Sequence, residues 1–219
     1  MNNDNKILLE HYKKGRFDKA EKLAISITKR SPSNQFSWKV LGSILKQTGR
    51  VEDSLFPCQK SVELMPEDPG AHNNLGNTFK ALNRLEEAEL SFRRALILDP
   101  NFAEAHNNLG ILLNTMSRLK EAEESLRQAI ASNSNFAEAY KNLGVMLNNL
   151  GKLEEAEANL RQALSIKKNY AEAHCALGDT LQELGRFNEC ELAYRESIKI
   201  NPDFAEAHCN LGVILQELG

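Results

Sequence analysis

The residues best suited to metal chemistry in this sequence are histidines, two of which directly precede a cysteine. The histidines are His72, His106, His174 and His208, and the dipeptides are His174-Cys175 and His208-Cys209. Imidazole and thiolate are the ligands that zinc prefers, in a tight tetrahedral arrangement. Neighbouring residues of a helix point to different faces, and the two dipeptides are too far apart in sequence to share one helix. We therefore predict that the rings pack between helices and that the chain holds no metal.

The remaining residues do not form a recognisable catalytic motif. The sequence contains no GxSxG, HExxH, GxxxxGK[ST] or GxGxxG motif. Carboxylates are abundant, but they recur at regular intervals on solvated helix faces, so any acid–base pair among them would be arbitrary. The sequence predicts that this chain is not an enzyme and needs no cofactor. A catalytic domain beyond residue 219 stays open.

Composition restricts the class of partner. The 219 residues are 42% hydrophobic and carry a formal net charge of −3, so the chain has no basic excess to attract a phosphate backbone. No apolar run reaches the ~18 residues that would span a bilayer, and the N-terminus lacks the pattern of a secretory signal. Four cysteines without CxxC spacing are typical of a reducing compartment. We expect a cytoplasmic protein whose partners are neither nucleic acid nor membrane.

The elements that position these side chains follow from an internal repeat. A Leu-Gly pair recurs every 34 residues without insertion or deletion, at 41–42, 75–76, 109–110, 143–144, 177–178 and 211–212. A small residue keeps the same interval, as at Ala88, Ala122 and Ala156, and a bulky one follows it four residues later, as at Phe92. Apolar residues within each unit recur at i, i+4, i+7 and i+8, which predicts two amphipathic helices per unit.

The pattern Trp38-x-x-Leu41-Gly42-x-x-Leu45, followed by alanine, an aromatic residue and proline, resembles the tetratricopeptide repeat family. The resemblance implies an all-α fold, a right-handed superhelix (α-solenoid) of antiparallel helix pairs. It covers the whole chain as a single solenoid over 1–219. The expected units are 1–34, 35–68, 69–102, 103–136, 137–170 and 171–204, with a half unit at 205–219.

Several local features are expected from the residues. Asn101 to Glu104 and its copies in later units are similar to a capping box that begins a helix. Gly49 and its counterparts predict a left-handed turn between paired helices. The glycine of each Leu-Gly pair costs about 1 kcal/mol in a helix, which predicts close approach to the small residue of the paired helix. Pro57 predicts a kink in the second helix of its unit.

The family resemblance implies that first helices line the concave surface, where a solenoid binds its partners. A ladder of asparagines directly precedes Leu-Gly, at Asn74, Asn108, Asn142 and Asn210, and can pair with a peptide backbone. This ladder is similar to the one lining the repeat region of protein O-GlcNAc transferases. The predicted groove residues are Asn73, Asn74, Asn77, Asn107, Asn108, Asn114, Lys141, Asn142, Asn148, Asn149 and Asn210.

Three functional readings follow. The leading one is a protein–protein interaction scaffold that binds an extended peptide or helix of a partner. An alternative is the substrate-recruiting region of a larger enzyme such as an O-GlcNAc-transferase-like glycosyltransferase. The third is self-association through the last helix, which ends on apolar residues without a polar cap and suggests a fragment. A clamp for a terminal carboxylate, built from Lys39 and Asn74, is disfavoured because Glu104 stands where a cation is needed.

Overall fold

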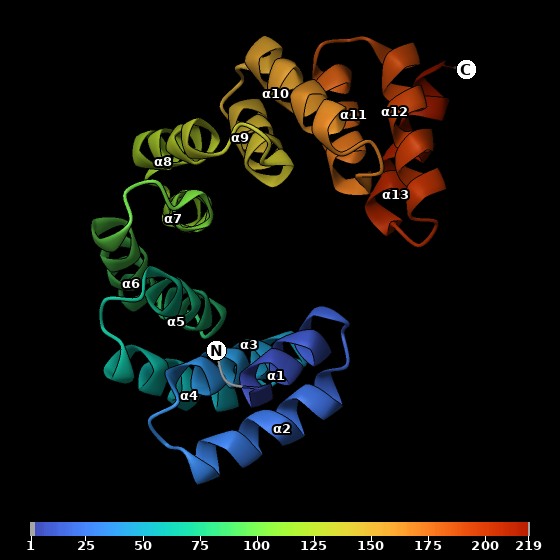
Figure 1. Cartoon of the computed structure of the whole chain (residues 1–219). Helices are drawn as coiled ribbons and strands as arrows, with labels where there is room; N and C mark the ends of the chain where they lie inside the picture. The colour runs from blue at the N-terminus through green and yellow to red at the C-terminus, as the bar shows by residue number, and fades with distance from the viewer. Residues whose placement is uncertain (1–2, 219) are drawn as a thin grey trace. The chain divides into compact units, whose positions relative to one another are not determined.

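A computed structural model describes residues 3–218, and all secondary structure within that range is helical (Figure 1). Two helices separated by a short turn fall within each of the six full units predicted from the 34-residue period, and one helix falls within the half unit. Every first helix from the second unit onward begins at the first residue of its unit, as Gln35, Pro69 and Ala103 illustrate. The all-α helical-repeat fold is therefore confirmed, whereas the handedness of a superhelix and the single solenoid over 1–219 stay predictions.

The chain divides into two compact parts, each of which contains several 34-residue repeats. We call residues 1–116 unit 1 and residues 117–219 unit 2. In unit 1, α1 pairs with α2, α3 with α4 and α5 with α6, and α7 packs against α5 and α6. The helices of unit 1 are α1 (Asn3–Lys13), α2 (Phe17–Arg30), α3 (Gln35–Gln47), α4 (Val51–Leu64), α5 (Pro69–Ala81), α6 (Leu85–Leu98) and α7 (Ala103–Thr115).

In unit 2, α9 pairs with α10 and α11 with α12, while α8 packs against α9 and α13 packs against α11 and α12. The helices of unit 2 are α8 (Leu119–Ser132), α9 (Ala137–Asn149), α10 (Leu153–Ile166), α11 (Ala171–Glu183), α12 (Phe187–Ile200) and α13 (Ala205–Leu218).

The turn inside each pair adopts the left-handed conformation predicted from the glycines. Gly49, Gly151 and Gly185 have φ of +80°, +71° and +70°. Asn83 and Ser117 occupy the same place in their units with φ of 57° and 60°. The backbone N–H of the third residue after the helix then donates to a carbonyl of its last turn, as Arg186 does to Leu181 at 2.9 Å, which closes a Schellman motif.

The helix starts differ from the predicted capping boxes. Helix α7 begins at Ala103 with Phe102 as N-cap, and no side chain caps it. The polar residue that fixes this loop lies earlier, because the Asp99 carboxylate accepts from the backbone N–H of Asn101 at 3.1 Å. Asn133 and Asn201 do the same in unit 2. The capping-box prediction was wrong because the loop is held by an Asx turn, which the sequence shows only as a polar residue.

The glycine of the Leu-Gly pair does approach the second helix closely, and the nearest atoms belong to the bulky residue four positions after the small one. A Cβ on Gly178 would lie 2.5 Å from the ring of Tyr194, and one on Gly76 would lie 2.7 Å from Phe92. Both bulky residues are fully buried. The missing side chain therefore makes room for the large residue that follows the alanine by four positions. The predicted contact with alanine is seen at Gly144, where a Cβ would lie 3.2 Å from the backbone oxygen of Ala156 and 2.6 Å from Leu160.

Two residues, Leu8 and Pro57, depart from the repeat pattern. Leu8, which replaces the glycine in the first unit, is fully buried against α2 and α3. Helix α4 runs without interruption from Val51 to Leu64 with Pro57 buried inside it, so the proline does not end the helix. The predicted kink concerns the direction of the helix axis and stays a prediction.

Candidate binding face

In unit 1, polar side chains connect successive first helices. The Nδ2 group of Asn74 on α5 donates to the hydroxyl of Ser43 on α3 at 3.1 Å. In the next 34-residue repeat of unit 1, Nδ2 of Asn108 on α7 donates to the carbonyl oxygen of Asn73 on α5 at 3.0 Å. Both asparagines of the ladder are half-buried, and their Oδ1 atoms accept no hydrogen bond within the described residues. The amide group is thus fixed while the carbonyl oxygen keeps its acceptor capacity.

Two predicted groove residues of unit 1 are interior instead. Asn73 is 8% exposed and Asn107 only 2% exposed, so neither offers a surface to a partner. Asn73 uses its carbonyl oxygen to accept from Asn108. Their assignment to the lining is corrected, because both side chains are covered by the surrounding helices of unit 1. Asn77 and Asn114 are half-buried and stay candidates.

In unit 2, the predicted residues of α9 differ from one another in environment. The ammonium group of Lys141 donates to the carbonyl oxygen of Asn142 at 2.6 Å. Burial lowers the pKa of Lys141 from its ordinary value, against the opposing charges of Glu138 and Glu172. Asn149 is exposed. The Oδ1 atom of Asn148 is buried and has no hydrogen-bond partner within the described residues.

The last asparagine of the ladder belongs to a polar cluster that links three helices of unit 2. Nδ2 of Asn210 on α13 donates to Oδ1 of Asp179 on α11 at 2.9 Å. The hydroxyl of Tyr194 on α12 donates to the same oxygen at 2.8 Å. Burial raises the pKa of Asp179 even though both hydrogen bonds favour its charged form. Helical spacing places Asp179 on the predicted lining of α11, but it does not indicate these hydrogen bonds, because the equivalent positions hold residues of unrelated chemistry.

The recurring histidines have a structural use. The Nε2–H groups of His72, His106 and His208 donate to the carbonyl oxygen of the proline six residues earlier, at 2.8–2.9 Å. Trp38 does the same with its indole N–H, at 2.8 Å from the carbonyl of Pro32. A ring with an N–H group therefore holds the loop that precedes these first helices, which refines the packing role predicted from the sequence.

The carboxylate clamp considered for Lys39 meets a second obstacle in the structure. Lys39 forms an ion pair of 2.7 Å with Asp68, which also accepts from Gln35 at 2.8 Å and from the backbone N–H of Gly70 at 2.9 Å. Burial alone would raise the pKa of Asp68, but the hydrogen bond and charge of Lys39 outweigh it and hold that pKa below its ordinary value. Lys39 is thus already neutralised by an internal carboxylate.

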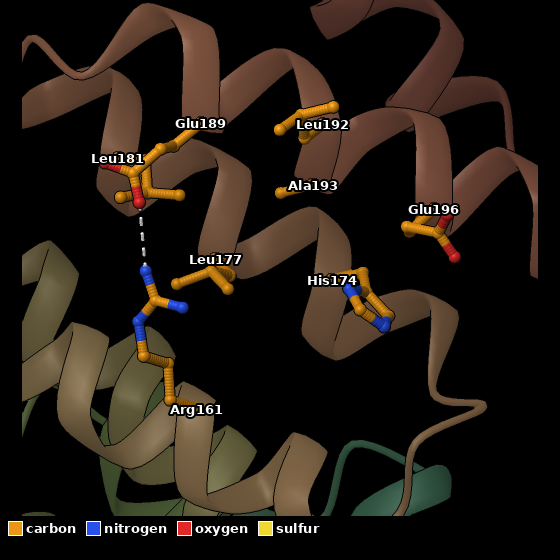
Figure 2. A pocket seen from close by; sticks show the side chains of 8 residues that line it. All are labelled: Arg161, His174, Leu177, Leu181, Glu189, Leu192, Ala193 and Glu196. Carbon is orange, nitrogen blue, oxygen red and sulfur yellow. Dashed lines mark hydrogen bonds and ion pairs between the residues drawn. The ribbon is translucent and has the colours of Figure 1, made fainter.

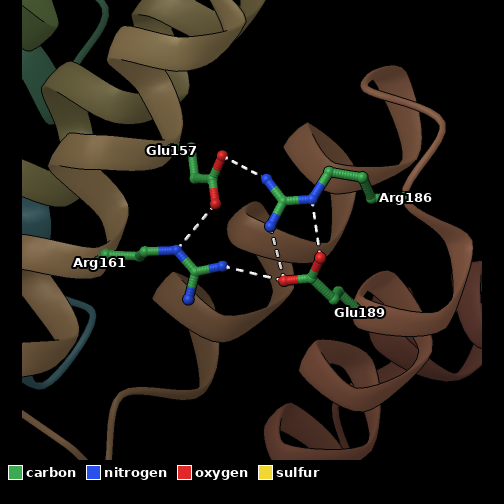
Figure 3. A network of polar contacts seen from close by, with 4 residues as sticks. All are labelled: Glu157, Arg161, Arg186 and Glu189. Carbon is green, nitrogen blue, oxygen red and sulfur yellow. Dashed lines mark hydrogen bonds and ion pairs between the residues drawn. The ribbon is translucent and has the colours of Figure 1, made fainter.

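The second helices of unit 2 present a charged surface. Glu157 and Arg161 on α10 form a closed ring of ion pairs with Arg186 and Glu189, at 2.6–3.3 Å (Figure 3). Such exposed pairs are screened by water and contribute little to stability. The ring occupies the carboxylates and guanidinium groups in mutual contacts, which disfavours a role for these four residues in catalysis.

A shallow hollow of about 220 Å³ lies beside this ring, between α10, α11 and α12 (Figure 2). Its apolar wall includes Leu177, Leu181 and Leu192, and the ion pair between Arg161 and Glu189 crosses one side. Pockets that enclose small ligands are larger, at about 300–1,000 Å³, and bury most of the ligand surface. The hollow therefore does not indicate a small-molecule site.

Apolar side chains are exposed on the last helix. Val213, Leu215 and Leu218 of α13 are 49%, 43% and 40% exposed. A Cβ on Gly212 would meet nothing within 4 Å, in contrast to Gly178, which faces a paired helix. Among residues 3–218, no helix is both long enough and apolar enough to cross a membrane.

Comparison with solved structures supports the fold. The chain of an APC/C hetero-tetramer, Cut9-Hcn1, aligns with a TM-score of 0.90 at 16% identity over 97% of this chain and 42% of that chain, so our chain spans less than half of that relative. PilW, a widely conserved type IV pilus biogenesis factor, aligns at 0.83 and 20% identity, covering 97% of this chain and 96% of that chain. YrrB, described as a TPR protein with an unusual peptide-binding site, aligns at 0.61 and 22% identity, with 85% and 96% covered.

Comparison with protein families gives the closer assignment. No curated protein sequence matches the chain. Models described as tetratricopeptide repeat match residues 69–102, 91–124 and 125–158, and a model described as TPR repeat matches 146–185 and 183–219. Together these matches extend without a gap from residue 69 to residue 219, well over half of the sequence. The chain belongs to the tetratricopeptide repeat family.

Proposed function

We propose that this chain is a protein-interaction scaffold that binds an extended peptide segment across its first helices. The observation that carries the proposal is the pair of carboxamides on α5 and α7. Asn74 and Asn108 each have a fixed amide group and an unused, partly accessible carbonyl oxygen. A backbone N–H of a partner is the complementary donor, and its use would not depend on the partner's side chains.

The spacing of helices suits an extended segment. Packed helices lie about 8–10 Å apart, and residues of an extended chain rise about 3.3 Å each. Acceptors on successive first helices would therefore engage about every third residue of the segment. YrrB, which shares the fold at low identity, is described as having a peptide-binding site, and this supports a peptide as the kind of partner.

Unit 2 adds a charge preference. The first helices α9 and α11 carry Glu138 and Glu172, whose charges act on Lys141, and α11 also carries Asp179. Lys141 is itself tied to Asn142. Carboxylates thus outnumber the one lysine of this face, and we expect a segment bound there to be neutral or basic rather than acidic.

The test uses random peptides immobilised on an array, from which binders of the chain are selected. The double variant Asn74→Ala, Asn108→Ala should no longer bind the peptides that contact unit 1. Gln59→Ala, an exposed carboxamide on α4, serves as the matched control and should retain it. N-methylation of the contacting peptide residues should weaken binding by roughly tenfold per hydrogen bond. Peptides that bind the double variant and tolerate N-methylation at every position would refute the proposal.

Circular dichroism must accompany this test, because the double variant also loses the hydrogen bonds to Ser43 and Asn73. The alternative of a recruiting region in a larger enzyme uses the same face and differs only in what is attached to it. Sequence following residue 219 in the gene decides between the two. A cytoplasmic location also stays a prediction, which fluorescence microscopy of the tagged protein would check.

Self-association through α13 rests on its exposed apolar side chains. Val213 and Leu215 are the most exposed of these on the helix, and Gly212 lies open beside them. Light scattering over a concentration series should show a rise in mass for the natural chain and a smaller rise for Val213→Glu. A constant monomer mass for both would refute this part of the proposal.

A further inference from the structure

We propose that Cys175, Asp179 and Glu206 form a binding site for a zinc-like divalent cation between α11 and α13. One ligand atom from each side chain lies within 4.8 Å of the other two. Cys175 and Asp179 are four residues apart on α11, so that they share one face of the helix. Glu206 comes from the first turn of α13, which packs against α11. The three donors thus converge from two helices rather than from one acidic stretch.

The environment of the three donors indicates that a positive charge is missing. The Cys175 thiol is 2% exposed and makes no hydrogen bond within residues 3–218. Neither Asp179 nor Glu206 forms an ion pair with a lysine, arginine or histidine in that range. Three groups that act as electron-pair donors are therefore held together, and no cationic side chain of residues 3–218 pairs with them. A bound divalent ion would neutralise this cluster and give the buried sulfur a partner.

Asp179 is oriented as a ligand carboxylate should be. Its Oδ1 atom accepts from Tyr194 at 2.8 Å and from Asn210 at 2.9 Å, so the carboxylate plane is fixed from two sides. Its other oxygen accepts no hydrogen bond within the described residues and is available to a cation. Hydrogen bonds of this kind around a ligand typically raise metal affinity by ten- to a hundredfold.

The chemistry of the donors selects the ion. A thiolate with two carboxylates favours zinc over magnesium or calcium, which prefer oxygen ligands alone. Zinc–sulfur bonds of about 2.3 Å and zinc–oxygen bonds of about 2.0–2.2 Å require the donors to approach one another further, and the exposed side chain of Glu206 can supply that movement. On binding, the S–H bond of Cys175 breaks, its proton passes to solvent, and the sulfur forms the metal bond. Three protein ligands leave the fourth position to water or to a group of a partner.

The simpler interpretation is that Cys175 is a buried apolar-like residue of the core. The two interpretations differ in their response to metal. They also differ from the dipeptide site considered for His174-Cys175, because His174 donates to the backbone carbonyl of Lys168 at 3.2 Å and is not part of the cluster. The cluster could not be found from sequence, since Glu206 lies on another helix.

Cobalt(II) is the probe, because a Co²⁺–thiolate bond gives a charge-transfer band in the near ultraviolet. Titration of the reduced, metal-free chain with Co²⁺ should produce this band at a single Co²⁺ per chain, and Zn²⁺ should abolish it by displacement. Cys175→Ser should eliminate the band. Cys209→Ser, which changes the exposed cysteine on α13, is the matched control and should retain it.

A second variant keeps the test decisive if Cys175→Ser fails to fold. Glu206 is exposed, so Glu206→Gln should leave the fold intact while weakening Co²⁺ binding by at least about tenfold, the loss seen even for partners of metal ligands. Absence of the band in the natural chain would overturn the proposal. So would a band that survives Cys175→Ser, or unchanged affinity of Glu206→Gln.

Discussion

Exchange of Gly178 for alanine tests whether the glycine of the Leu-Gly pair is required by its contact with the second helix. The new Cβ would lie 2.5 Å from Cε1, 2.7 Å from Cδ1 and 2.9 Å from Cζ of Tyr194. That ring is fully buried, and its hydroxyl is tied to Asp179 at 2.8 Å, so it has no free direction in which to move. We expect α11 and α12 to separate slightly.

The magnitude follows from two opposing effects. Overpacking of a well-packed core costs about 1–3 kcal/mol. Replacement of a mid-helix glycine by alanine returns about 1 kcal/mol through helix propensity. Because the ring cannot move aside, we expect the cost in the upper part of that range, about 2–3 kcal/mol, so the net change should lower the free energy of unfolding by about 1–2 kcal/mol. Gly212 is the matched control in the same place of its own unit, because its Cβ would meet nothing within 4 Å. Gly212→Ala should raise the free energy of unfolding by up to about 1 kcal/mol.

Urea denaturation followed by far-ultraviolet circular dichroism measures both variants. Repeat proteins can unfold in segments, so the transition midpoint and its slope are compared together. Opposite signs for the two variants are the expected result. If Gly178→Ala were as stable as the natural chain, or if both variants were destabilised alike, the contact with Tyr194 would not be the reason for the glycine.

Three shorter predictions concern other contacts. Gly185→Ala places a side chain at a φ of +70° in open space, so it should cost about 1 kcal/mol through backbone conformation alone, as measured by urea denaturation. The lowered pKa of Asp68 means that its ion pair with Lys39 contributes stability above the unfolded pKa of about 3.9 and loses it as pH falls through the native pKa. The stability difference between the natural chain and Asp68→Asn should therefore shrink below about pH 4. Of the four cysteines, only the exposed Cys209 should react rapidly with a thiol reagent in the native protein, and the other three only after denaturation.

The strict 34-residue period made the helical-repeat fold predictable from the sequence, and from the second repeat onward each first helix begins at the first residue of its predicted repeat. Leu41 and its copies fix which residues face the core, and any shift would expose them. The conformations of the turns and loops were harder to predict from the sequence, because several kinds of side chain can adopt the same turn or bond the same backbone N–H groups. Asn83 takes the place of a glycine at a positive φ, and Asp99 holds a loop where a cap was predicted from Asn101. When different residues can form the same turn or loop contact, a single sequence shows no clear pattern for it.

The candidate face was less predictable for a geometric reason. Asn73 and Asn74 are neighbours in sequence with the same side chain, yet one is buried and the other partly accessible. Successive residues of a helix differ by about 100° in direction, and the position of the neighbouring helix decides which of the two is covered. Helical spacing alone placed both in the groove. The structure also shows that the amide groups of Asn74 and Asn108 already serve the contact between helices.

The residues that repeat in every unit are explained by packing, and this directs attention to the positions where units differ. Gly76 and Gly178 face the second helix of their pairs, and the rings of His72 and His208 hold the preceding loops. Their recurrence therefore carries little information about the partner that the protein binds. From the second repeat onward, in contrast, position 73 and its copies hold lysine, asparagine and cysteine twice each, at Lys39, Asn73, Asn107, Lys141, Cys175 and Cys209. Because the fold does not require a particular side chain at this position, each 34-residue repeat can carry a different functional group there. In unit 2 this position places the thiol of Cys175 beside the carboxylates of Asp179 and Glu206.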